Sequence, residues 1–416
     1  MNSIAGQAPL TALNPGMTSP VAAAKARTRL IAIDALRGLV MLFMLVDHVR
    51  ETWFLHLQVT DPVDANITDN WRDRALCRET DPGLFFTRLL STFCAPTFVA
   101  LTGLSAWLYG QSHSRAQVSE FLLKRGLFLI FLEFTIVCYA WPTQANTFPP
   151  PTIWFQVIYT IGISMIALAA LLHLPRPAQF ALGLAIVCLH NLLDPIRLSP
   201  DWPFFIPWAM LHQRDKFEIA GILFKTTYPV LPWIGIILLG YACGPWFARG
   251  TDPKPRIKRL AMLGLGLLVG FLLIRTLNFY GDKPWFIADT SLRTVMSFLA
   301  LTKYPPSLLF LMLTVGTGCL LLALCEKFED SKMMPTLAML GGAPMFYYIL
   351  HLYTLKLLYN IAMLLYGPTK GAVFGVDNLR WVWIWVFILI PVLYFPTRWF
   401  ARLKQRRKDI WWLKYL

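Results

Sequence analysis

The first apolar stretch of the chain, residues 31–48, carries ionisable side chains at helical spacing. Arg37 follows Asp34 by three residues and precedes His48 by eleven, and Met41 and Met44 fill intermediate positions of the same stripe. Residues at such spacing share one face of an α-helix, and at about 1.5 Å rise per residue the stripe is roughly 21 Å long. Because charges inside an apolar span are costly, they indicate function. The stretch predicts a helix that lines a polar path across most of a membrane.

Histidine is the residue of this chain best suited to acid–base chemistry near neutral pH. His48 is the leading candidate for a general base because it belongs to the polar stripe, and His56 and His351 are secondary candidates. Asp47 could raise the basicity of His48, although adjacent residues on a helix point in different directions. The alternative for His48 is an imidazole exposed at the membrane interface.

Asp34 and Arg37 have two interpretations. They could form an i,i+3 ion pair that closes a structural contact with a neighbouring helix. They could instead present charge to a ligand near the cytoplasmic end of the helix. We retain both interpretations, and the second makes the pair a candidate binding site.

Further polar residues gather at the ends of later apolar runs. Taken singly, each has a structural explanation as a helix cap, a turn or a helix opener. Taken together, they predict a polar cavity that opens on the extracytoplasmic side. The candidate binding residues of this group are His190, Arg275, Asn278, Tyr280, Asp282, Lys303 and Tyr304.

The composition identifies the elements that must position these residues. The 416 residues are 56% hydrophobic and only 15% charged, with a mean hydropathy of +0.53. Soluble domains contain about 25% charged residues, so the chain is an integral membrane protein. The net charge of +15 is then a topology signal and not an indication of nucleic-acid binding.

The apolar runs predict an all-α polytopic bundle of ten transmembrane helices, or eleven. Basic residues are concentrated in the segments that would be cytoplasmic if the N-terminus is inside, which places both termini in the cytoplasm. Residues 1–29 are expected to be a disordered tail, 30–401 the membrane domain and 402–416 a basic tail. The predicted spans are 31–48, 86–109, 121–141, 153–172, 178–193, 228–247, 259–277, 306–325, 336–365 and 380–400.

Absent motifs narrow the chemistry further. The sequence has no GxSxG, P-loop, HExxH or GxGxxG pattern, so the serine hydrolase, nucleotide hydrolase, zinc protease and dinucleotide enzyme classes lack support. Its seven cysteines have no zinc-like spacing with each other or with histidine. We therefore expect neither a metal nor a disulfide.

Several segments together resemble a known family, the bacterial DUF1624 proteins. This group is similar to the catalytic domain of heparan-alpha-glucosaminide N-acetyltransferase, within a superfamily of transmembrane acyltransferases. The resemblance covers residues 29–400. It rests on Asp34-Ala-Leu-Arg37-Gly38, Asp47-His48, Phe93-Cys94-Ala95-Pro96, Thr102-Gly103-Leu104-Ser105-Ala106, Tyr228-Pro229, Pro232-Trp233, Asn278-Phe279-Tyr280-Gly281-Asp282, Thr302-Lys303-Tyr304-Pro305-Pro306-Ser307 and Pro344 to His351.

The resemblance implies acyl transfer across a bacterial inner membrane. Cytoplasmic acyl-coenzyme A, acetyl by preference, would donate its acyl group to an extracytoplasmic amino sugar, glycan or glycolipid. Asp34 and Arg37 would position the donor, and His48 would act as general base or acyl carrier, with His56 as the alternative histidine. Asn278 and Asp282 would help to bind the acceptor. The expected partners are the lipid bilayer, acyl-coenzyme A and the acceptor, with no nucleic acid and a homo-oligomer left open.

Two other classes fit the same residues. A transporter or channel for a small polar or anionic solute would use the polar face of the first helix as a pathway lining. A sensory or scaffold protein without turnover is disfavoured by the charges inside the apolar runs. Binding of acyl-coenzyme A separates the first class from an acyltransferase.

Overall fold

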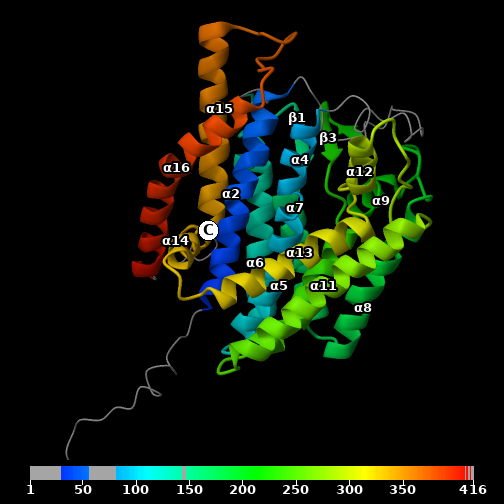
Figure 1. Ribbon diagram of the computed structural model, residues 1–416, viewed down its shortest axis with the longest axis vertical. Helices are drawn as coiled ribbons and strands as arrows, with labels where there is room; N and C mark the ends of the chain where they lie inside the picture. The colour runs from blue at the N-terminus through cyan, green and yellow to red at the C-terminus, as the bar shows by residue number, and fades with distance from the viewer. Residues whose placement is uncertain (1–29, 56–80, 143–146, 408, 411–412, 414–416) are drawn as a thin grey trace, which may run out of the picture. The chain divides into compact units, whose positions relative to one another are not determined.

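The computed structural model describes residues 30–55, 81–142, 147–407, 409–410 and 413, and these form a bundle of helices (Figure 1). His56 and the predicted tail 1–29 lie outside the described residues. The chain is mostly helical, as predicted. The long helices are α2 (Ile31–Trp53), α5 (Cys94–Gly110), α6 (Arg115–Leu132), α7 (Val157–Leu171), α8 (Arg176–Leu189), α10 (Leu231–Ala242), α11 (Pro253–Leu277), α13 (Leu308–Lys327), α15 (Pro344–Tyr366) and α16 (Arg380–Arg406).

Six helical segments of the described chain are long and apolar enough to cross a membrane: Pro82–Gly110, Arg176–Leu193, Pro253–Leu277, Leu308–Lys327, Pro344–Tyr366 and Arg380–Arg406. Two shorter apolar helices, α7 and α10, accompany them. The charges of α2 keep it out of this group, because it holds Asp34, Arg37, Asp47, Arg50 and Glu51. The number of spans and the side of the termini remain predictions.

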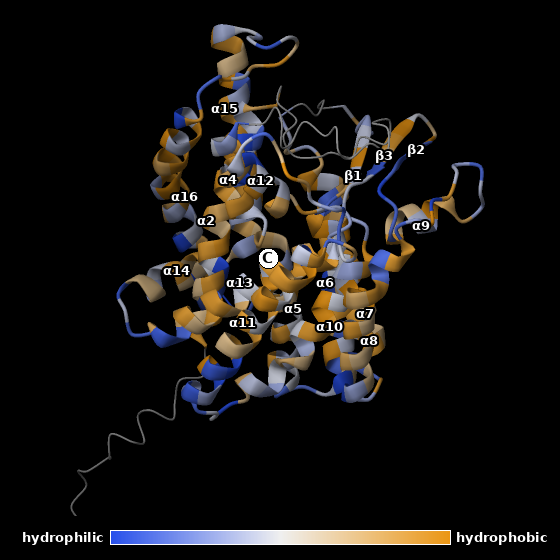
Figure 2. Ribbon diagram, turned by 45° about the vertical axis from the view of Figure 1, so that its right-hand side comes forward, coloured by the Kyte–Doolittle hydropathy of each residue, from blue (hydrophilic) through white to orange (hydrophobic). Residues whose placement is uncertain are grey.

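The outward faces of several helices are apolar. In Figure 2 the helices are largely hydrophobic along their lengths, while hydrophilic residues are frequent at helix ends and in loops. Large exposed apolar side chains recur every three or four residues along α16, which places them on one face. Lipid, and not water, is the solvent that suits such a face. These side chains are Trp381, Ile384, Phe387, Ile388, Val392, Phe395 and Trp399.

The predicted all-α class needs one correction, because the structure contains a small three-stranded sheet. β1 (Thr152–Phe155) pairs in parallel with β3 (Ile222–Thr226), and β2 (Lys216–Ile219) pairs with β3 in antiparallel. The β2–β3 hairpin turns through Ala220 and Gly221, which both have positive φ. Strands of four or five residues are too short to stand out from apolar helices by periodicity.

The remaining elements are short and connect the long helices. The predicted spans 86–109 and 336–365 are each divided into two helices, the second at Gly342, so the bounds of these helices differ from the predicted runs. The short elements are α4 (Pro82–Ser91), η3 (Glu133–Val137), η4 (His190–Leu193), α9 (Phe205–Leu211), η5 (Gly244–Phe247), α12 (Ser291–Leu299) and α14 (Met333–Gly341).

Helix α2 is packed against α14 without intervening side chains. A Cβ added at Gly38 would lie 2.0 Å from the carbonyl oxygen of Leu337, and one added at Gly341 would lie 1.9 Å from that of Asp34. Only glycine permits two helix backbones to approach so closely. Since α15 begins three residues after α14 ends, this contact also fixes the start of α15 relative to α2.

Candidate active site

The structure brings together two histidines that are 303 residues apart. Nδ1 of His48, on α2, lies 2.6 Å from Nε2 of His351, on α15. The two rings are parallel within 3°, with centroids 4.9 Å apart. His351 is fully buried and His48 is half-buried. A short contact between two imidazole nitrogens requires that one of them carry a proton and the other accept it.

The backbone determines which nitrogen of the pair is the acceptor. Nδ1 of His351 lies 2.9 Å from the carbonyl oxygen of Tyr347. A carbonyl oxygen only accepts, so this nitrogen donates, and in a neutral ring Nε2 of His351 is then the acceptor. Nδ1 of His48 therefore donates to it. The lone pair of His48 is left on Nε2, which has no hydrogen-bond partner in the described part of the chain.

Two aromatic side chains cover the histidine pair. Trp141 and Tyr348 both meet the His48 ring edge to face, with centroid distances of 5.5 and 6.0 Å. Trp141 Nε1 and Tyr348 Oη are buried and have no hydrogen-bond partner among the described residues. Buried donors without partners are costly, so these two groups are suited to receive a ligand oxygen beside His48.

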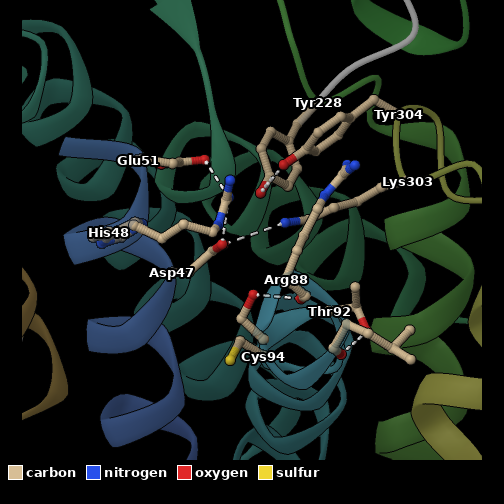
Figure 3. A network of polar contacts seen from close by, with 12 residues as sticks. Asp47, His48, Glu51, Arg88, Thr92, Cys94, Tyr228, Lys303 and Tyr304 are labelled. Carbon is tan, nitrogen blue, oxygen red and sulfur yellow. Dashed lines mark hydrogen bonds and ion pairs between the residues drawn. The ribbon is translucent and has the colours of Figure 1, made fainter. Parts of the chain in front are cut away.

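Asp47 belongs to an ion cluster beside the pair and does not hydrogen-bond to the His48 ring in the described structure. Its carboxylate lies 2.7 Å from Arg50 and 3.8 Å from Lys303 (Figure 3). Arg50 is buried and also contacts Glu51 at 3.6 Å. The carboxylate of Asp47 thus neutralises two cations, and its action on the basicity of His48 stays a prediction.

Lys303 and Tyr304 connect this cluster to the segment that precedes α13. Burial lowers the pKa of the Lys303 ammonium, but the Tyr228 oxygen and the Asp47 carboxylate outweigh burial and raise its pKa above the usual value. Lys303 is therefore a cation at neutral pH. The Tyr304 hydroxyl donates to the Tyr228 hydroxyl at 2.9 Å, as Figure 3 shows.

Asp34 and Arg37 form the predicted i,i+3 pair, at 3.0 Å, near the other end of α2. Arg37 also donates to the Ser105 hydroxyl and, at 3.4 Å, to the Leu101 carbonyl, so it ties α2 to α5. Arg125 of α6 is close enough for the two guanidinium charges to repel each other. Arg125 has no carboxylate partner within the described ranges, which leaves excess positive charge at this end.

The other predicted binding residues make no hydrogen bond or ring contact with the histidine pair among the described residues, and their hydrogen bonds hold nearby backbone and hydroxyl groups in place. His190 contacts the carbonyls of Ile186, Val187 and Pro306. Arg275 donates to four backbone carbonyls, and Asn278 caps α11 and bonds both ways with the Trp285 backbone. Tyr280 donates to the Cys188 carbonyl. Asp282 accepts from Thr302 and Ser307.

Sequence reasoning missed four residues of the site: Arg50, Arg125, Trp141 and Tyr348. Arg50 and Arg125 had a usable signal, because each is a charge that continues or interrupts an apolar run. Trp141 and Tyr348 had none, because aromatic residues are frequent throughout this chain. No group of His, Cys, Asp and Glu suited to a metal ion occurs among the described residues.

The fold and the site thus define a helical membrane protein with a histidine pair between α2 and α15 and two arginines, Arg37 and Arg125, near the other end of α2. The chain belongs to the family described as heparan-alpha-glucosaminide N-acetyltransferase, catalytic, which it matches over residues 29–281. The matched part includes His48, Trp141 and Tyr228, whereas Lys303 and His351 follow it. No curated protein matches the chain. The family implies an acyltransferase.

Proposed function

We propose that the chain transfers an acyl group, acetyl by preference, from acyl-coenzyme A to an amine or hydroxyl of an amino sugar, glycan or glycolipid. The observation that carries the proposal is the His48–His351 pair, because its hydrogen-bond order leaves a basic lone pair on Nε2 of His48. A nitrogen with an unshared lone pair can take up a proton and return it, as acid–base catalysis of acyl transfer requires.

In the general-base route, the acceptor forms a bond to the thioester carbonyl carbon while Nε2 of His48 takes its proton. The C–S bond then breaks, the electron pair leaves with sulfur, and His48 returns the proton to the thiolate. Tyr348 Oη and Trp141 Nε1 are the donors at hand for the negative oxygen of the tetrahedral intermediate. In the acyl-carrier route, Nε2 itself forms a bond to the thioester carbonyl carbon and the C–S bond breaks, so coenzyme A leaves as the thiolate. The acceptor then bonds to the acyl carbon, the C–N bond breaks with its electron pair returning to Nε2, and the acceptor proton ends on the thiolate.

Two arginines near the N-terminal end of α2, Arg37 of α2 and Arg125 of α6, support the placement of the donor. Arg37 and Arg125 supply guanidinium groups, which bind phosphates strongly. Arg37 precedes His48 by eleven residues, or about 17 Å along the helix. This distance is of the order of an extended pantetheine arm, so a coenzyme A held at Arg37 would present its thioester near His48.

The proposed topology follows from charge. If consecutive helices cross the membrane in alternating directions, the basic segments 249–259 and 398–408 lie on the same side as Arg37. Positively charged segments favour the cytoplasm. The donor would thus approach from the cytoplasm of a bacterial inner membrane. The acceptor would meet His48 from the opposite side.

Purified protein tests the proposal through coenzyme A binding and turnover. We expect acyl-coenzyme A to bind and to be consumed with an amino-sugar acceptor, and His48→Gln to lower kcat by about 10²–10⁴-fold with little change in donor binding. The variant His113→Gln, at a half-buried histidine between α5 and α6, is the matched control. Absence of coenzyme A binding at millimolar ligand would rule the proposal out and favour the transporter class.

The order of substrate binding separates the two chemical routes. Parallel double-reciprocal lines and a stoichiometric burst of free coenzyme A indicate the acyl-carrier route, whereas intersecting lines without a burst indicate the general-base route.

A further inference from the structure

The segment that carries Trp141 leaves α6 through a π-helix. α6 continues into η3, where the Cys138 amide donates to the Glu133 carbonyl at 2.9 Å, which is the i to i+5 bond of a π-helix. Trp141 follows the end of η3 by four residues. A helix end leaves carbonyl oxygens without a donor from its own backbone. Donors from other elements can therefore hold this segment in place.

Two side chains of α15 supply such donors. The Tyr353 hydroxyl donates to the Ile136 carbonyl at 2.9 Å, and the Lys356 ammonium donates to the Tyr139 carbonyl at 2.6 Å. Tyr353 and Lys356 are three residues apart, so they share one face of α15. The second carbonyl belongs to the residue two positions before Trp141. α15 therefore holds the backbone at the end of η3 and just before the indole.

Lys356 is a costly residue for a purely structural task. It is buried within Pro344–Tyr366, one of the helices apolar enough to cross a membrane, and a cation inside such a helix is expensive to insert. A neutral hydroxyl is sufficient to satisfy one carbonyl, as Tyr353 shows. A charge-assisted hydrogen bond is shorter and stronger than a neutral one. The lysine therefore holds the Tyr139 backbone more firmly than a hydroxyl would.

A second anchor fixes the start of η3. Glu133 is buried, and its Oε2 accepts from the amides of Ile158 and Tyr159 at 3.1 and 3.0 Å. These amides belong to the first turn of α7, where backbone N–H groups lack acceptors within the helix. The start of η3 is thus tied to α7 and its end to α15, so two helices determine the path of the chain to Trp141.

α15 thereby fixes two ring neighbours of His48. It runs beside α2, which carries His48 (Figure 1). His351 precedes Lys356 by five residues on α15, or about 7.5 Å along the helix axis, and its ring lies parallel to that of His48. Trp141 meets the same His48 ring edge to face, at 82°. A displacement of the Tyr139 backbone would therefore move the indole and leave the histidine pair in place.

We propose that Lys356, assisted by Tyr353, is a positioning residue that holds the Trp141 indole beside His48. The inference rests on the proposed function, in which Nε1 of Trp141 is a donor for the negative oxygen of the tetrahedral intermediate. In this role Lys356 acts through Trp141 and not on the substrates. Loss of the lysine lowers kcat because a hydrogen-bond donor stabilises the transition state only when it is aimed at the atom where charge develops.

The placement of the indole can be measured without turnover. In full-length protein labelled with 5-fluorotryptophan and held in nanodiscs, fluorine NMR resolves the tryptophans, and Trp141→Phe identifies the Trp141 resonance. We expect Lys356→Met to shift or broaden this resonance and Lys356→Arg, which still donates, to restore it. Tyr353→Phe removes only an exposed hydroxyl and should give a smaller change in the same direction.

A hydrogen bond elsewhere on α15 provides the matched control. Thr354→Val removes a hydroxyl that donates to the Leu350 carbonyl of the same helix at 2.8 Å, so it should leave the Trp141 resonance unchanged. A Trp141 resonance that neither Lys356→Met nor Tyr353→Phe alters would overturn the proposal.

A double-mutant cycle separates positioning from general damage to the fold. Lys356→Met should lower kcat by about ten-fold with KM for acyl-coenzyme A unchanged, and Lys356→Arg should recover most of the loss. In a Trp141→Phe background, which already lacks the indole donor, Lys356→Met should cost nothing further. An equal loss in both backgrounds would show that Lys356 acts by another route, and the positioning role would be rejected.

The two proposals fail separately. A protein whose Trp141 resonance responds to Lys356→Met, but which neither binds nor consumes acyl-coenzyme A, rejects the acyltransferase and retains the control of the indole by Lys356. A protein that consumes acyl-coenzyme A, but whose Trp141 resonance is the same with and without the lysine, rejects the positioning role alone.

Discussion

Nε2 of His351 accepts a hydrogen bond from Nδ1 of His48 at 2.6 Å, and the Tyr347 carbonyl holds His351 in the tautomer that this bond requires. The backbone of α15 thereby selects the reactive nitrogen of a residue on α2. His351 is thus a positioning residue, and its role is to keep Nε2 of His48 free.

This relationship predicts different effects for two substitutions at position 351. A glutamine amide oxygen can accept from His48 Nδ1, so His351→Gln should retain more activity than His351→Leu, which we expect to lose about 10²-fold. The measurement is kcat across pH. His351→Leu should also shift the acidic limb of the profile, and equal losses without a shift would contradict the positioning role.

The two arginines near the N-terminal end of α2 predict a change in donor affinity. Arg37→Gln and Arg125→Gln should each raise KM for acyl-coenzyme A by about ten-fold, since each removes a guanidinium from the proposed phosphate site. Lys124→Gln is the matched control, because Lys124 precedes Arg125 on α6, is exposed and is paired with Glu120. If all three variants raise KM for acyl-coenzyme A equally, the effect comes from the overall positive charge and not from a phosphate site at Arg37 and Arg125.

The ion cluster predicts a stability effect that is separate from catalysis. Asp47→Asn leaves the buried Arg50 and Lys303 without their shared carboxylate, which should destabilise the fold by about 3–5 kcal/mol. Adding Lys303→Met should recover part of the loss because one of the two cations is removed. Thermal unfolding in detergent measures both variants, and additive losses would show that the two residues do not interact.

The contact between α2 and α14 predicts that Gly38 cannot be enlarged. Gly38→Ala places a methyl group 2.0 Å from the Leu337 carbonyl oxygen, so we expect a loss of about 1–3 kcal/mol together with lower kcat. Gly266→Ala on α11 is the control, because nothing lies within 4 Å of its added carbon. Equal unfolding temperatures for the two variants would show that the backbones separate easily.

The sequence predicts the polar helix well because its signal is local. Asp34, Arg37 and His48 lie on one short segment, and the helical repeat alone places them on one face. The pairing with His351 has no such signal, since 303 residues separate the two rings and only the packing of α15 on α2 joins them.

The polar residues of the later helix ends are a second case, and their role in binding stays a prediction. Arg275, Asn278 and Asp282 read as binding residues, yet their hydrogen bonds go to backbone and to nearby hydroxyls. Connecting segments at a membrane surface contain many carbonyl and amide groups that need partners, and a polar side chain that satisfies them looks the same in sequence as one that binds a ligand.

The glycine contact between α2 and α14 also bears on how substrates reach the histidines. α14 leads into α15 after only two residues, so α2, α14 and α15 form one frame that carries both rings of the pair. A shift of about 1 Å within this frame would break the 2.6 Å contact. Any opening and closing during a catalytic cycle must therefore be performed by the helices outside the frame, while the two histidine rings keep their relative position.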